Sequence, residues 1–300
     1  MLMGVDWGGT KIEVVAMSED GVEHFRERED TPRGDYAGCL SVMAALVDRA
    51  EAVVGPVGRV GVGIPGSIDP TTGLGKGASS TWMIGRPVEH DLREAFRGRE
   101  IRAVNDVDVL ATSEARDGAG VGYRVVFAAN FASGVGGGIA IDGRAHHGPN
   151  NNAADWGHNP LPWPGDDEVP GPSCWCGLVG CVETWVSGRS FQAQYEAASG
   201  ERLHGSAIVA MARSGDALAS ELLDRYIDRV ARGLAVVVNA LDPDIFVFGG
   251  GMSNVDELYD RLPTEIVQYT FTTVFTTPIV KSKHGDSSGV RGAAWLWAEE

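Results

Sequence analysis

Glycine is the feature that most limits what this chain can fold into. The chain has 41 glycines among its 300 residues, about twice the usual ~7%. Most of the clusters follow apolar runs that are typical of buried strands, and they lie at 8–9, 61–66, 134–138 and 249–251. They do not recur at every third residue, which excludes a collagen-like helix. We therefore expect backbone that passes very close to a ligand or to another segment.

The order of apolar patterns predicts an α/β protein. Alternating and β-branched runs predict strands at 2–6, 12–17, 22–28, 59–64, 101–104, 124–130, 139–141 and 245–248. Helical spacing predicts helices over 35–54, 88–96, 106–116 and 216–241. One arrangement occurs twice: a strand, then Asp6 or Asn130, then a glycine-rich turn and a second strand. This echo predicts two similar lobes that face each other across a cleft.

Charge and composition exclude several classes of protein. The chain carries 25 Lys and Arg against 41 Asp and Glu, a net charge of −16, which argues against non-specific binding to nucleic acid or to an anionic membrane. No run of eighteen apolar residues predicts a membrane span, and the first residues lack the basic and apolar segments of a secretory signal. Four cysteines do not form a disulfide framework. We expect a cytoplasmic protein.

Two glycine patterns imitate nucleotide-binding motifs. Gly61, Gly63 and Gly66 satisfy the dinucleotide pattern, but a helix should follow that pattern, and Pro65 with the loop-like run after it makes one unexpected. The segment from Gly4 to Lys11 nearly spells a P-loop, but Thr10 precedes the lysine and a strand follows. It is either a plain hairpin turn or a hairpin whose N–H groups meet phosphate.

A cysteine cluster predicts a metal site. Cys174, Cys176 and Cys181 lie within eight residues, and His158 lies sixteen residues before the first of them. Three thiolates and one imidazole complete the closed tetrahedron of structural zinc, while the alternatives are buried free thiols or a redox pair. Cys39 is expected in the core. The remaining histidines lack such context and are expected on the surface or in packing, and those considered are His146, His147, His204 and His284.

Phosphoryl transfer needs N–H groups for phosphate, a metal ion and a carboxylate near the acceptor hydroxyl. The turn from Asp6 to Thr10 and the turn from Ala132 to Gly136 offer N–H and hydroxyl donors, and Asp6 is a candidate for holding Mg²⁺ through water. Asp106 follows a strand end, where α/β sheets expose ligand-binding groups. The alternative for Asp106 is a helix N-cap.

These segments together resemble the ROK family (repressors, open reading frames and kinases) of bacterial sugar kinases. The resemblance covers essentially the whole chain, through DWGGTK at the start, IPGSI at 64–68, SGVGGG at 133–138, WGHNPLPW at 156–163, CWCGLVGCVE at 174–183 and GGGMSN at 249–254. The ending KHGDSSGVRGAAWLW looks most like the fructokinase or mannokinase branch. The DNA-binding helix-turn-helix of the family's repressors is not found.

The resemblance implies an actin-like ATPase fold (ribonuclease H-like), with ATP and Mg²⁺ between two α/β lobes and a structural Zn²⁺. It implies that Asp106 is the general base for a sugar hydroxyl. The ATP-binding residues that it implies are Asp6, Gly8, Gly9, Thr10, Lys11, Ser133, Gly134, Gly136, Gly249, Gly250 and Gly251. The sugar-binding residues that it implies are Ser79, Asn105, Asp155, His158 and Glu183.

The chain departs from the family pattern around one pocket. Asp155 stands where the family usually has Glu, and Ala132-Ser133-Gly134 replaces the usual Gly-Thr-Gly. Val107-Asp108 replaces a small residue followed by Asn, which adds a charge near the base. The stretches 150–154 and 77–80 are also altered. These changes indicate an altered sugar preference or weakened activity.

The hypothesis is therefore an ATP-dependent, fructokinase-like hexose kinase that acts on the 6-hydroxyl, with the alternative of a ROK-type sugar-binding protein whose catalysis is weakened. Residues 1–108 are expected to form a small lobe and 109–286 a large one, with a helix at 287–300 packing back on the small lobe. A homodimer is expected from the resemblance.

Overall fold

The computed structural model describes residues 1–77 and 80–298. Their contacts divide the chain into two compact units, each described here by itself. The first unit holds Met1–Arg124, Gly138–Ala153 and the residues from Lys283 onward, and the second holds Val125–Gly137 and Ala154–Ser282.

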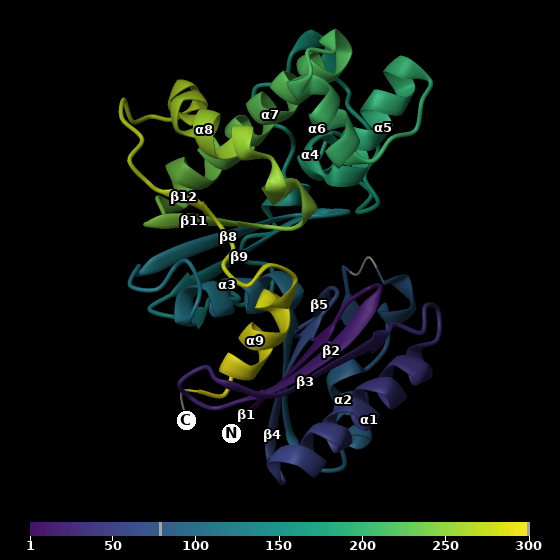
Figure 1. The fold of residues 1–300 in the computed structure, drawn as a ribbon. Helices are drawn as coiled ribbons and strands as arrows, with labels where there is room; N and C mark the ends of the chain where they lie inside the picture. The colour runs from purple at the N-terminus through teal and green to yellow at the C-terminus, as the bar shows by residue number, and fades with distance from the viewer. Residues whose placement is uncertain (78–79, 299–300) are drawn as a thin grey trace. The chain divides into compact units, whose positions relative to one another are not determined.

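The first unit is built on a five-stranded sheet with the order β3-β2-β1-β4-β7 (Figure 1). Its strands are β1 (Leu2–Trp7), β2 (Lys11–Met17), β3 (Glu23–Asp30), β4 (Arg59–Ile64) and β7 (Glu100–Asn105). The first three pair antiparallel, and β4 and β7 extend the sheet parallel to β1. A short antiparallel pair, β5 (Ser67–Ile68) and β6 (Gly75–Lys76), follows β4.

Helices cover both faces of this sheet. Side chains alternate between the two faces along β1, so its apolar residues form a core on each side. Met3, Val5 and Trp7 share a core with α1 (Tyr36–Val54) and α2 (Val88–Ala95). Leu2 lies on the opposite face in a cluster with Val290 and Ala294 of α9 (Ser288–Trp295). Asp35 begins α1 by accepting the N–H of Gly38.

The close approach of α9 explains several glycines. A Cβ on Gly4 would lie 2.3 Å from the carbonyl oxygen of Val290, and one on Gly61 would lie 1.8 Å from that of Ala293. Gly61 therefore allows α9 to approach the sheet. The element after β4 is the strand β5 and not a helix, which confirms that the dinucleotide pattern is a packing feature. The helix α9 also packs on α3 (Asp106–Arg116). All of α3 thus falls in the first unit, whereas the sequence analysis set a boundary at residue 108.

Gly292 gives a direct test of this packing. A Cβ there would lie 1.7 Å from the carbonyl oxygen of Val109, so the two helix backbones must separate. We expect Gly292→Ala to lower the free energy of unfolding by about 2 kcal/mol or more, although alanine is the better helix former. Urea denaturation measures this, with Gly58→Ala as the control, because a Cβ on Gly58 meets no atom within 4 Å. An equal effect of both substitutions would contradict the proposed cause.

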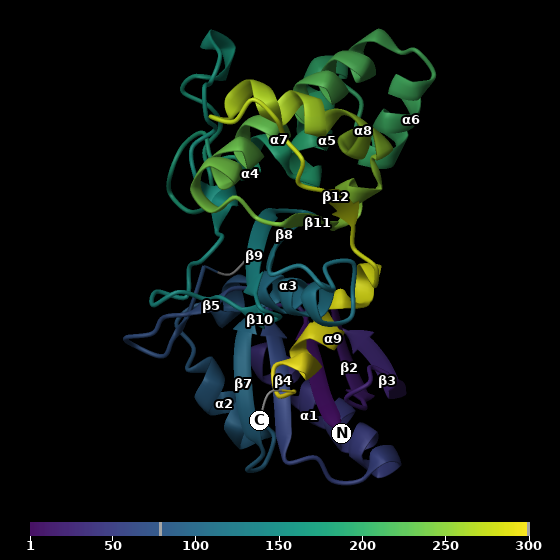
Figure 2. The same cartoon turned by 90° about the vertical axis from the view of Figure 1, so that its left-hand side faces the viewer.

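The second unit contains most of a sheet with the order β10-β9-β8-β11-β12 (Figure 2). The strands of this sheet are β8 (Val125–Phe131), β9 (Val135–Ile141), β10 (Arg144–Ala145), β11 (Ile245–Gly249) and β12 (Ile279–Lys281). The end of β9 and all of β10 belong to the first unit. Its helices are α4 (Glu183–Val186), α5 (Gly188–Ser199), α6 (Gly205–Arg213), α7 (Ala217–Leu241) and α8 (Asp256–Glu265). Short 3₁₀ turns lie at Thr81–Met83, Trp156–His158, Asp166–Glu168, Gly251–Asn254, Ile266–Tyr269 and Gly285–Ser287.

The two sheets repeat one strand order, which agrees with the echo in the sequence. The predicted loop at 134–138 is mostly strand, because β9 begins at Val135. A Cβ on Gly137 would meet Trp156 at 2.7 Å, and one on Gly138 would meet the carbonyl oxygen of Val107 at 2.2 Å. These glycines therefore permit close packing within a strand. The helices between residues 183 and 213, and α8, were not predicted. Among the described residues, no helix is both long and apolar enough to cross a membrane.

Candidate functional site

The first glycine turn joins β1 to β2. It is held by a hydrogen bond within its own backbone and by hydrogen bonds from Thr31 and Arg33. The N–H of Gly8 donates to the carbonyl of Lys11 (2.9 Å), and the Thr31 hydroxyl donates to the carbonyl of Gly8 (2.7 Å). Arg33 Nε donates to the carbonyl of Gly9 at 3.1 Å. Because the carbonyls are occupied from one side and Thr10 is exposed, the turn is suited to an anion at its N–H groups. Lys11 Nζ lies 3.3 Å from Glu13.

Asp6, the residue before the last in β1, lies on the face of the sheet that α9 covers. Its side chain is 9% exposed, and a Cβ on Gly289 would lie 3.0 Å from its Oδ2. Burial raises the pKa of Asp6 to about 6, against the opposing effect of Lys11. A buried carboxylate without a full complement of partners is costly to keep charged. This is the environment expected of a carboxylate that receives a cation when the site is filled.

Asp6→Asn should therefore stabilise the protein when no cation is bound. The folded-state pKa lies above the unfolded value of 3.8, so ionisation of Asp6 opposes folding above about pH 6 and ceases to do so near pH 4. We expect the substitution to raise the free energy of unfolding by about 2 kcal/mol at about pH 8, and by much less at about pH 4. Urea denaturation in chelator at both pH values measures the difference. A gain that did not depend on pH would contradict this origin.

Asn105 and Asp106 stand where β7 becomes α3. The N-cap is Asn105, whose Oδ1 accepts the N–H of Val107 at 2.9 Å and whose Nδ2 donates to the carbonyl of Gly66 at 2.9 Å. Asp106 is the first helical residue, so the N-cap interpretation of Asp106 is wrong. Asp106 therefore lies at a strand end and a helix start, where α/β sheets expose ligand-binding groups.

The second glycine turn joins β8 to β9 and is tied to Glu183. One carboxylate oxygen of Glu183 accepts the N–H of Val135 at 2.9 Å, and the other accepts the indole N–H of Trp175 at 2.6 Å. A Cβ on Gly134 would lie 2.6 Å from Glu183 Oε2, so a larger residue there would require the Glu183 side chain to move. Ser133 is exposed at the tip. Glu183 thus links the cysteine segment to the turn, and its predicted contact with sugar stays a prediction.

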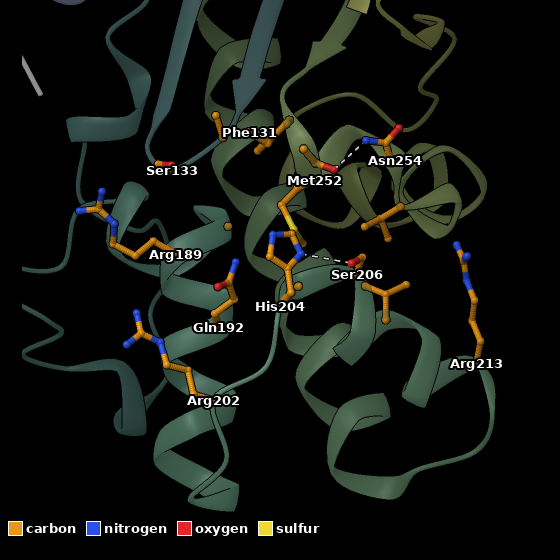
Figure 3. A pocket seen from close by; sticks show the side chains of 16 residues that line it. Phe131, Ser133, Arg189, Gln192, Arg202, His204, Ser206, Arg213, Met252 and Asn254 are labelled. Carbon is orange, nitrogen blue, oxygen red and sulfur yellow. Dashed lines mark hydrogen bonds between the residues drawn. The ribbon is translucent and has the colours of Figure 1, made fainter. Parts of the chain in front are cut away.

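A cavity of about 570 Å³ opens beside this turn, wholly within the second unit (Figure 3). It brings together two predicted nucleotide residues, Ser133 and Gly251. Gly249 ends β11, and Gly250 joins it to Gly251. Gly250 has φ 81°, and a Cβ on it would lie 2.4 Å from the carbonyl oxygen of Phe131. The side chains that sequence reasoning missed come from α5, α6 and the turn before α6, and they are Arg189, Gln192, Arg202, His204, Ser206 and Arg213.

These missed residues give the cavity its polar character. His204 is exposed, as expected, and it lines the cavity with Nδ1 3.1 Å from the Ser206 hydroxyl (Figure 3). Arg213 donates to Glu257 at 2.7 Å. The helix cap at Ser187, which accepts the N–H of Ser190, is a sequence signal that would have revealed α5. A cavity of this size that combines apolar walls with a few polar groups is typical of a small-ligand site.

The cysteine cluster has the geometry of a tetrahedral metal site. The ligand atoms of His158, Cys174, Cys176 and Cys181 all lie within 4.8 Å of one another. Cys176 Sγ is 3.7 Å from Cys181 Sγ, and Cys174 Sγ is 3.5 Å from His158 Nδ1. A zinc ion with Zn–S bonds of 2.3 Å would place its sulfur ligands roughly 3.8 Å apart. The donor set therefore fits Zn²⁺ in both chemistry and spacing.

Other predicted residues stand as follows. Asp155 precedes the 3₁₀ turn of His158, whose N–H donates to the Asp155 carbonyl at 3.2 Å. Ser79 lies outside the described residues. Cys39 is buried in the core, as expected. His284 Nε2 is 3.0 Å from Asp117, and His147 is 2.8 Å from Asp108, so both have ionisable partners that the sequence analysis did not foresee.

Comparison with known proteins settles the family. The sequence profile of the ROK family matches residues 2–300. The chain belongs to the ROK family. Its relatives include the N-acetyl-D-glucosamine kinases of Haemophilus influenzae, 36% identical over 99% of each chain, and of Pectobacterium atrosepticum, 37% identical over 99% of this chain and 98% of that one.

Solved structures of the ROK family agree in fold. The ROK hexokinase of Thermus thermophilus shares 27% identity with a TM-score of 0.86, covering 98% of this chain and 97% of that one. A ROK glucokinase of Streptomyces griseus, solved with glucose and AMPPNP, shares 27% identity with a TM-score of 0.80, covering 98% of each. The predicted family and the actin-like ATPase fold are confirmed. The predicted fructokinase branch is not what the relatives' names indicate.

Proposed function

We propose that this ROK protein is an ATP- and Mg²⁺-dependent kinase that phosphorylates N-acetylglucosamine at its primary 6-hydroxyl. The observation that carries the proposal is the identity of 35–37% to N-acetylglucosamine kinases over nearly the full length of both chains. The sugar differs from the fructose that the ending of the sequence suggested. The cavity beside Ser133 and Gly251 is the proposed nucleotide site, and the start of α3 is the proposed acceptor site.

In the proposed reaction, Asp106 accepts the proton of the attacking hydroxyl. The sugar oxygen forms a bond to the γ-phosphorus while the bond from that phosphorus to the bridging oxygen breaks, so the products are a sugar phosphate, ADP and a proton. Asp6 would hold Mg²⁺ through water, and the ion would neutralise phosphate charge. The resemblance to the family assigns contacts with phosphate oxygens to the turns at Gly8–Thr10 and Ser133–Gly136, and a contact with a sugar hydroxyl to Asn105.

We also propose that His158, Cys174, Cys176 and Cys181 hold one structural Zn²⁺. The fit of their spacing to Zn–S geometry supports this. Four protein ligands leave no open position for water, so the metal would hold the segment in shape rather than act on substrate. The homodimer and the cytoplasmic location stay predictions.

A sugar panel tests the function. ATP consumption is measured in a coupled assay with N-acetylglucosamine, N-acetylmannosamine, fructose, mannose and glucose, with thermal-shift binding in parallel. We expect kcat/KM for N-acetylglucosamine to exceed that for fructose by roughly tenfold or more, because a site that pairs the acetamido group loses those hydrogen bonds with fructose. Faster turnover of fructose would reinstate the fructokinase hypothesis. Binding without turnover of every sugar would favour the sugar-binding alternative.

A further inference from the structure

A buried carboxylate, paired with a partly exposed histidine, lies two residues beyond the proposed base. Asp108, in the first turn of α3, is 7% exposed, and its Oδ2 lies 2.8 Å from Nδ1 of His147. Asp108 is one of the positions where this chain departs from the family pattern. Because a buried carboxylate is strongly destabilising without a partner, the departure at Asp108 requires a partner such as His147.

His147 also organises the segment 146–153 that follows β10. Its carbonyl accepts the N–H groups of Asn152 and Ala153, both at 3.1 Å. Two residues of the segment then reach the β5–β6 pair: the Asn151 carbonyl accepts the Ser67 hydroxyl at 2.8 Å, and the Asn150 carbonyl accepts Lys76 Nζ at 3.0 Å. The segment is therefore anchored at one end by the His147 ring and at the other by β5 and β6.

The start of α3 meets the same stretch of chain. Asn105 Nδ2 donates to the carbonyl of Gly66, and Asn151 Nδ2 donates to the carbonyl of Ile68 at 3.0 Å. The helix start and the segment 146–153 thus both contact residues 66–68. The His147–Asp108 pair also joins the helix start to the segment directly. In the chain, Asp106 lies between Asn105 and Asp108, the two residues of α3 and its N-cap that make these contacts.

We propose that His147 and Asp108 are a positioning pair that holds the segment 146–153 as a wall of the acceptor-sugar pocket beside Asp106. The proposal rests on the proposed function, because it assigns the acceptor to Asp106. Neither residue touches the reacting atoms. The pair acts by fixing the wall, so it sets the affinity for the sugar more than the rate of the chemical step.

Kinetics of His147 variants test the role. We expect His147→Ala to raise KM for the sugar about tenfold, the effect of losing a hydrogen bond to a charged group, while kcat and KM for ATP stay close to the wild-type values. His147→Asn should restore much of the loss, since its Nδ2 can donate where the ring Nδ1 does. His146→Ala is the matched control, because that neighbouring side chain is exposed. A fall in kcat alone, or an equal effect of His146→Ala, would overturn the proposal.

Amide hydrogen exchange provides a measurement that does not depend on activity. In substrate-free His147→Ala, we expect faster exchange at Asn152 and Ala153, and unchanged exchange at Val107, whose N–H is held by Asn105. Unchanged exchange at 152 and 153 would overturn the positioning role, even if the sugar KM rose. If the wild-type protein phosphorylated no sugar, the proposed function would fail, and the exchange result would still decide whether the pair holds the segment.

Discussion

Asp106→Asn should lower kcat for sugar phosphorylation by roughly 10²–10⁴-fold, the usual contribution of a general base. The amide cannot accept the proton of the attacking hydroxyl, yet it keeps the size of the carboxylate at the first position of α3. The fold should persist, because the N-cap hydrogen bond from Val107 is made by Asn105. Nucleotide binding, measured by calorimetry, should therefore stay near the wild-type affinity.

Asp142→Asn is the matched control for this experiment. It makes the same chemical change at an exposed turn residue with φ 52°, a conformation that asparagine tolerates. Its kcat should equal that of the wild type. If the Asp106→Asn protein retained near wild-type kcat, Asp106 would not be the general base. If the protein lost nucleotide binding as well, the loss of activity would indicate a defect in folding instead.

Loss of the cysteine cluster should have the largest effect on stability. We expect about one Zn²⁺ per chain by metal analysis, and we expect Cys181→Ala to lower the free energy of unfolding by about 4 kcal/mol or more. The reason is that the segment from 146 to 182 has little regular structure, and Cys181 and Val179 make only isolated bridges to Pro160 and Ser173. Binding of the metal would supply the stability that a larger core supplies elsewhere.

Cys39→Ala serves as the control, because it also removes one thiol but leaves the four ligands intact. It should retain the metal and lose less stability. The hydrogen bonds from Trp175 to Glu183 and from Val135 to Glu183 connect the cluster to the second glycine turn, so Cys181→Ala should also weaken nucleotide binding. A fully folded wild-type protein that contains no metal would contradict the zinc proposal.

Much of the site was visible in the sequence because its residues act through local geometry. Asp6 and Asp106 lie at or just after the ends of predicted strands, and the three cysteines lie close together in the chain, so strand patterns and spacing selected them as candidates. Asn105 and the role of Asp106 as the base came from the resemblance to the family. His158, sixteen residues upstream, needed the chemistry of a four-ligand site to be added. The helix at 217–241 was predicted closely because its apolar stripe runs for seven turns between Asp216 and Pro243.

The cavity and the pair at α3 were not visible, because they depend on contacts between segments far apart in the chain. Arg189 and Gln192 lie on α5 and His204 immediately precedes α6, and they meet Gly251 only after α5 and α6 pack on α7. His147 acquired a role from Asp108, a residue 39 positions away. No rule of sequence spacing predicts these contacts, because the distance in space between such residues is set by how the strands and helices between them pack.

Glycine shows the division between the two kinds of information. Its abundance and clustering predicted backbone that comes close to other groups, the order of apolar patterns predicted an α/β chain, and the sequence motifs carried the resemblance to the family. Tertiary packing decided which glycines lie beside a proposed phosphate site and which admit a helix. A Cβ on Gly9 would meet Ser80 Oγ at 3.6 Å, an ordinary contact, whereas a Cβ on Gly61 or Gly292 would lie less than 2 Å from a backbone carbonyl oxygen. The physical reason is that periodicity reports which face of an element is buried, while the atoms that cover that face are set by the whole fold.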